Sequence, residues 1–203
     1  MLPPNRKQLG LIKAGLFLLA LIPLARLLWL GMHDDLGANP IEFIERSTGT
    51  WALVILLVTL SFTPLRLLTG TAWPVQLRRM AGLFMFFYAC LHITTYVWLD
   101  HWFDWQEIAK DIIKHPYVLV GFAAFVLSVP LALTSSNAMI KRLRQRWKTL
   151  HRLVYLVAIF AVLHFWWLVK KDITEPMLYA LVLAALLAIR LVFSLRKRKG
   201  QMV

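Results

Sequence analysis

Residues 80–99 read MAGLFMFFYACLHITTYVWL, an almost wholly apolar stretch with a histidine, His92, about 12 residues from its start. Twenty residues of α-helix rise about 30 Å, which matches the hydrocarbon thickness of a bilayer. The apolar residues do not alternate with polar ones, as they would in a membrane β-strand. The stretch therefore predicts a transmembrane helix that carries an ionisable side chain deep in the membrane.

Five other segments share this length and character, and the chain as a whole is 60% hydrophobic with only 16% charged residues. That composition is too apolar for a soluble domain of 203 residues. We predict an all-α integral membrane bundle of six transmembrane helices, forming a single domain over residues 1–203. The expected spans are 13–30, 51–68, 80–99, 117–133, 151–169 and 177–194.

The charges separate by sign along this pattern. Although the net charge is +13, the basic groups within 6–13, 66–79, 141–152 and 196–199 fall on one side of six crossings, and all ten acids fall on the other. Because positive residues are retained in the cytoplasm, both termini are predicted to be cytoplasmic. This placement indicates a membrane orientation and gives no reason to expect nucleic-acid binding.

Several kinds of site are disfavoured. The single cysteine, Cys90, cannot form a disulfide within the chain or attach haem through a Cys-x-x-Cys-His motif. No dinucleotide-binding or phosphate-binding glycine motif occurs, no internal repeat is evident, and the connections are too short for a soluble catalytic domain. No Asp or Glu falls inside the expected spans, which disfavours a proton-coupled transporter.

His92 and His164 are the ionisable side chains expected deep in the core. They lie about 12 and 13 residues from the inner starts of their helices, or roughly 18 and 20 Å, so their depths match. Two neutral imidazoles on neighbouring helices can ligate one haem iron. The alternative is that each histidine only hydrogen-bonds to a polar group on a neighbouring helix.

A second haem nearer the cytoplasm is less clearly indicated. His151 lies 13 residues before His164, so an ideal helix would point the two side chains about 140° apart. A second haem at His151 would therefore need a distorted helix, or the two haems would have to approach this helix from different sides. The helix partner of His151, 14 residues before His92, is Arg78. Arg78 and Arg79 either bind haem propionates or a flavin phosphate, or they only mark the cytoplasmic face. If His151 binds no haem, it is an ordinary residue of the membrane interface.

Several short phrases occur together along the chain: Asn39-Pro-Ile-Glu, Thr63-Pro-Leu-Arg, Arg78-Arg79 ahead of Leu91-His92, and Trp147-x-x-Leu-His151-x-x-x-Tyr155 ahead of His164. In this combination the sequence resembles the MsrQ (formerly YedZ) family, the haem-binding membrane subunits of the protein-methionine-sulfoxide reductase system. That family lies within the ferric-reductase-like transmembrane group. The resemblance covers nearly the whole chain.

The resemblance implies a multi-pass protein of the bacterial inner membrane with b-type haem, one or two per chain, and flavin mononucleotide (FMN). Electrons would come from a cytoplasmic flavin reductase or the quinone pool and pass to a periplasmic molybdopterin subunit, MsrP, which reduces methionine sulfoxide in oxidised proteins. His92, His151 and His164 match the family's haem-linked positions. The chain itself would have no substrate-reducing site.

The larger group carries two histidines on each of two helices, and Arg78 departs from that pattern, which leaves the haem number open. Two other functions also stay open. One is a small transporter in which the histidines relay protons or bind a metal, and the other is a structural or assembly factor in which they only pack. The acidic connections are either a docking surface for a partner or a solvated face.

Overall fold

The computed structural model describes residues 4–169 and 171–199, and within these ranges it is helical without any strand. Six stretches are long and apolar enough to cross a membrane, which confirms the predicted all-α bundle of six spans. Their bounds are Arg6–Met32, Pro40–Thr69, Trp73–Asp100, Pro116–Leu133, Gln145–Leu168 and Thr174–Arg196.

The long helices are α1 (Arg6–Met32), α2 (Pro40–Thr69), α3 (Arg78–Thr94), α5 (Pro116–Leu133), α8 (Leu153–Leu168) and α9 (Thr174–Lys199). A 3-10 turn, η1 (Trp73–Leu77), precedes α3, and a π-helical turn, η2 (Thr95–Asp100), follows it. Short helices α4 (Trp105–Lys114), α6 (Asn137–Leu143) and α7 (Gln145–Leu150) lie in the connections.

Helix α2 begins eleven residues before the predicted start of its span, at Pro40 instead of residue 51. The Asn39 side chain accepts a hydrogen bond from the Glu42 N–H, and Pro40 occupies the first turn, where no backbone donor is needed. The helix ends at Gly70, which adopts the left-handed conformation that glycine tolerates. The predicted span 51–68 lies within this longer helix, and the first turns of α2, ahead of that span, carry Glu42 and a half-buried Glu45.

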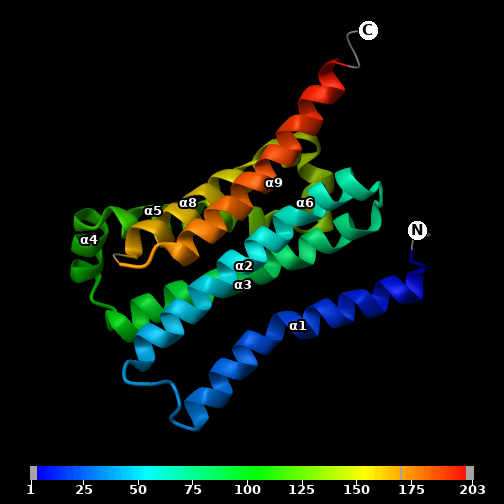
Figure 1. Cartoon of the computed structure of the whole chain (residues 1–203). Helices are drawn as coiled ribbons and strands as arrows, with labels where there is room; N and C mark the ends of the chain where they lie inside the picture. Colours follow the sequence, from blue (N-terminus) through cyan, green and yellow to red (C-terminus); the bar gives the residue numbers. More distant parts are fainter. Residues whose placement is uncertain (1–3, 170, 200–203) are drawn as a thin grey trace.

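Two helix pairs make up the centre of the bundle: α2 packs against α3, and α5 packs against α8 (Figure 1). Leu56 and Leu60 of α2 are buried against Tyr88 of α3 and Ala158 of α8. Helix α1 lies at the edge and exposes much of its apolar surface, as expected of a helix in contact with lipid.

The helix connections gather at two ends of the bundle (Figure 1), and the sequence gives these ends different charge. The α1–α2 connection, helix α4 and the α8–α9 connection lie at one end, which we call the acidic end because all ten acids lie in or beside these segments. The start of α1, the turn between α2 and η1, helices α6 and α7 and the last turns of α9 lie at the other, which we call the basic end.

Tyr88 connects α1 to the bundle beside a proline. Its side chain is 0% exposed, and its hydroxyl donates to the Ala20 carbonyl (2.7 Å) and accepts from the Leu24 N–H (3.2 Å). Pro23 lies between these two residues and, because it has no N–H, interrupts the hydrogen bonds of α1 there. A polar group from a neighbouring helix can satisfy backbone atoms next to such a break.

We predict that Tyr88→Phe weakens the attachment of α1. Removal of the hydroxyl leaves the partly buried Ala20 carbonyl without this donor, so the free energy of unfolding should fall by about 1–3 kcal/mol in detergent-based denaturation. The control is Tyr179→Phe, whose half-buried ring packs edge-on against Phe165. Equal stability of the two variants would show that the Tyr88 hydroxyl does not hold α1.

Candidate functional site

His92 of α3 and His164 of α8 face each other toward the acidic end of the bundle, with ring centres 6.2 Å apart and ring planes inclined at 72°. Nδ1 of His92 donates to the Glu45 carbonyl (3.0 Å), and Nδ1 of His164 donates to the Tyr117 carbonyl (2.7 Å). Because a carbonyl only accepts, Nδ1 carries the hydrogen in both neutral rings, and each Nε2 keeps a free lone pair.

The spacing of the two rings suits one metal ion held between them. Metal–imidazole bonds are about 2 Å long, so two imidazoles on opposite sides of one metal have ring centres about 6 Å apart. Ligating histidines usually donate their other ring N–H to a carbonyl or carboxylate, as His92 and His164 do here. The structure thus brings together the two histidines that the sequence predicted to meet.

A glycine lies under each ring. A Cβ atom at Gly49 of α2 would lie 3.1 Å from Nδ1 of His92, and one at Gly121 of α5 would lie 2.6 Å from Nδ1 of His164. Any larger residue at these positions would press into the imidazoles, so the glycines allow each ring to lie directly on the neighbouring helix.

These contacts repeat along the chain. In each helix pair, the residue whose carbonyl accepts from the histidine comes four residues before the glycine and 47 residues before the histidine. These residues are Glu45, Gly49 and His92 in one pair, and Tyr117, Gly121 and His164 in the other. No internal repeat is evident in the sequence, and the structure adds this repeated set of contacts around the two histidines. The two halves share so little other sequence that a repeat of three residues is hard to recognise without coordinates.

His151 lies where the helix is interrupted. Helix α7 ends at Leu150 and α8 begins at Leu153, so His151 and His164 are not on one ideal helix, and the distortion anticipated from their spacing is present. The His151 ring stacks on Trp147 at 3.9 Å, and its Nδ1 donates to the Trp147 carbonyl. Its Nε2 is buried, and although the ring lies near the Leu131 carbonyl, this nitrogen makes no hydrogen bond of ordinary geometry within the described residues.

Arg78 and Arg79 were predicted to act together, but their side chains lie in different surroundings. Arg79 is exposed and donates to Asn137 of α6. Arg78 is half-buried, near His151 and near a third arginine, Arg190 of α9. Only Arg78 of the pair therefore reaches the interior of the bundle.

Comparison with known proteins identifies the family. A model described as "Ferric reductase like transmembrane component" matches residues 48–162, a range that includes His92 and His151. The protein-methionine-sulfoxide reductase heme-binding subunit MsrQ of Herminiimonas arsenicoxydans is 52% identical over 198 residues, covering 96% of this chain and 91% of the relative. The chain belongs to the MsrQ family.

Two further MsrQ relatives support this membership. The protein from Ralstonia nicotianae is 51% identical over 193 residues, covering 94% of this chain and 88% of the relative. The protein from Bordetella pertussis is 50% identical over 198 residues, covering 97% and 96%. The family resemblance predicted from the sequence is thereby confirmed.

A polar cluster at the acidic end of this MsrQ-family chain lies beside Tyr117, whose carbonyl accepts from His164. Tyr96 donates to one oxygen of Asp111 (2.6 Å), and His115 donates to the other (2.6 Å). Partial burial acts to raise the pKa of the Asp111 carboxyl, but these hydrogen bonds and the nearby histidines hold it below its usual value. The ionised carboxylate thus fastens α4 to η2 and to the start of α5, where Tyr117 lies.

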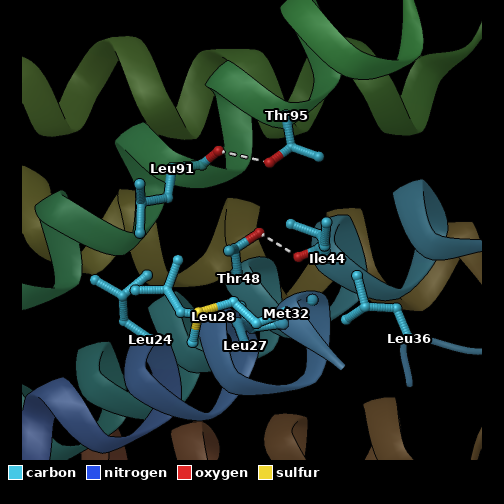
Figure 2. Close-up of a pocket in the computed structure, with 10 residues that line it drawn as sticks. Leu24, Leu27, Leu28, Met32, Leu36, Ile44, Thr48, Leu91 and Thr95 are labelled. Atoms are coloured by element: carbon cyan, nitrogen blue, oxygen red, sulfur yellow. Dashed lines mark hydrogen bonds between the residues drawn. The ribbon is translucent and has the colours of Figure 1, made fainter. Parts of the chain in front are cut away.

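An apolar groove beside the histidine pair has a different character. It lies between α1 and the α2–α3 pair, and Figure 2 shows Leu24, Leu27 and Leu28 of α1 on one side and Leu91 on the other. Two threonine hydroxyls in its wall donate to carbonyls of their own helices, from Thr48 to Ile44 and from Thr95 to Leu91 (Figure 2). Without imidazoles in its lining, the groove is suited to an apolar chain and not to iron.

Sequence reasoning missed the two glycines and Arg190. A lone glycine inside an apolar helix is a recognised signal of close backbone approach, and a lone arginine inside a span is a functional hypothesis by default. Arg190 lies within the predicted span 177–194, so the expectation that His92 and His164 were the ionisable groups left in the core was wrong.

The graded Cβ contacts lead to a prediction. Gly121→Ala should lower the free energy of unfolding by about 1–3 kcal/mol, because the added methyl would overlap the His164 ring. Gly49→Ala should cost less, because its contact is longer. Gly82→Ala is the control, since its Cβ would meet Thr59 at an ordinary 3.7 Å and alanine favours a helix. Denaturation of all three variants with equal midpoints would refute the close packing of these glycines against the rings.

Proposed function

We propose that this chain is a transmembrane electron carrier that binds b-type haem between His92 and His164. The observation that carries the proposal is the pair of neutral imidazoles 6.2 Å apart, each with Nδ1 committed to a carbonyl. The printed name of its relatives, a heme-binding subunit of protein-methionine-sulfoxide reductase, supports haem as the bound group. When bound, haem supplies a one-electron redox centre.

The residues around the haem have distinct tasks in this proposal. His92 and His164 bind the iron through Nε2, and the carbonyls of Glu45 and Tyr117 fix the tautomer and orientation of the rings. The surrounding apolar helices exclude water and so favour neutral ligands. Arg78, Arg79 and His151 were also predicted to bind cofactor, and of these Arg78 and His151 face the interior.

We further propose that the acidic end faces the periplasm and the basic end the cytoplasm, in the bacterial inner membrane, because basic segments are retained inside. The haem would then lie in the outer half of the bilayer, close to a periplasmic catalytic partner. The family resemblance makes that partner the molybdopterin subunit MsrP, which reduces methionine sulfoxide in oxidised proteins. A cytoplasmic flavin reductase or the quinone pool would supply electrons, and FMN would be a further cofactor.

The acidic end offers the partner a surface rich in carboxylates, although Arg46 and Lys110 pair there with Glu42 and Glu107. Asp34, Asp35, Asp104 and Glu107 are exposed there. A partner with a basic docking surface would be steered toward this end, and the attraction would weaken at high salt.

A visible spectrum of the detergent-purified protein tests the function. We expect a Soret band with sharp α and β bands on reduction, and we expect His92→Ala or His164→Ala to remove the haem held between these two rings. His33→Ala is the control, because the His33 side chain is exposed at the end of α1 and donates to the Trp29 carbonyl of its own helix. A colourless, folded wild-type protein would favour a transporter or assembly factor, and unchanged spectra in both ligand variants would refute the assignment.

A further inference from the structure

Two arginines converge in the basic-end half of the bundle. Arg78 is the first residue of α3, and Arg190 lies in the second half of α9. Both are half-buried and lie close enough for their charges to repel one another. Tyr155 of α8 lies beside both, and its ring centre is 5.2 Å from the guanidinium carbon of Arg190.

The contacts of Arg190 with the protein are all neutral. One terminal nitrogen donates to the Tyr155 hydroxyl and the other to the Leu60 carbonyl of α2. The remaining nitrogen, Nε, is buried and has no hydrogen-bond partner within the described residues. The guanidinium is therefore held on two sides, while no acid neutralises its charge and its Nε–H is unused.

No acidic side chain is available to these arginines. All ten acids lie between residues 34 and 45, 100 and 111, or 172 and 175, which are the segments at the acidic end. Burying two like charges in an apolar bundle without a counter-charge is strongly unfavourable. The arrangement therefore calls for an anion that is not part of the chain.

The neighbouring histidine identifies the kind of anion. His151 lies close to Arg78 and to the Leu131 carbonyl, but its buried Nε2 makes no hydrogen bond of ordinary geometry with that carbonyl or with another group of the described residues. A lipid or free phosphate would satisfy the arginines but leave this nitrogen unused. A haem carries both an iron that imidazole binds and carboxylates that guanidinium groups bind.

We propose that Arg78 and Arg190 form a binding site for the propionate carboxylates of a haem bound at His151. The inference rests on the proposed haem function, but it concerns different residues from those that hold the haem at His92 and His164. Guanidinium groups from α3 and α9 would neutralise the propionates, and the same contact would tie α9, which lies outside the family-model match, to the cofactor.

The test compares two forms of the cofactor. Full-length protein produced without haem is loaded in detergent with haem b or with haem dimethyl ester, in which both carboxylates are masked. The wild type should bind haem b at least about tenfold more tightly than the ester at one of its sites, because charge-assisted hydrogen bonds are lost with the ester. Arg78→Gln and Arg190→Gln should each reduce this preference severalfold or more.

Two controls match these changes. Arg79→Gln removes the exposed neighbour of Arg78, and Arg196→Gln removes an exposed arginine further along α9. Both should keep the wild-type preference for haem b. Arg190→Lys retains the positive charge and should keep part of that preference, which separates loss of charge from damage to the fold. His151→Ala should abolish binding at the same site.

Several outcomes would overturn the inference. One is an unchanged preference in Arg78→Gln and Arg190→Gln. Another outcome is that the wild-type protein, once denatured, releases bound FMN or phospholipid, and that Arg78→Gln and Arg190→Gln lose this molecule but no haem. The anion at the arginines would then be a phosphate. If haem still binds at His92 and His164 after either outcome, the proposed function stands. Failure of the wild type to bind any haem would refute the function itself.

Discussion

Two hydrogen bonds, each from a buried imidazole to a backbone carbonyl, determine what the interior of this bundle can bind. With Nδ1 of His92 donated to Glu45 and Nδ1 of His164 donated to Tyr117, the hydrogen of each neutral ring lies on Nδ1, and each Nε2 keeps its lone pair. Neutral rings avoid the cost of burying charge in the membrane, and free lone pairs are what a metal requires. Without these two bonds the rings could rotate, and their 6.2 Å separation would carry no chemical meaning.

The repeated contact pattern explains how six helices produce this geometry. Each helix pair, α2–α3 and α5–α8, contributes one carbonyl, one glycine four residues later and one histidine. The glycines let the helices approach closely enough for the hydrogen bonds to form, and the two pairs then present their histidines to each other. Toward the basic end this symmetry is lost, since His151 stands at a helix break and Arg78 and Arg190 lie nearby.

Much of this could be predicted from the sequence. Hydropathy located six spans, the acidic and basic segments separated as expected, and counting residues placed His92 and His164 at one depth, because helix rise is nearly constant. The start of α2 could not be found by hydropathy, since its first turns are polar and depend on the Asn39 cap. Gly49, Gly121 and Arg190 act through packing between distant helices, and the break at His151 separates α7 from α8 in a stretch with no proline or glycine.

Electron paramagnetic resonance of the ferric, full-length protein tests the central claim most directly, because the signal depends on the axial ligands of the iron. We expect a low-spin signal of iron with two imidazole ligands, strongly anisotropic because the rings are inclined at 72°. This signal should disappear when either His92 or His164 is substituted, because the haem between the two rings is then lost. A wild-type protein that carries haem but shows only high-spin iron would contradict the account, since the two rings would then not share the metal.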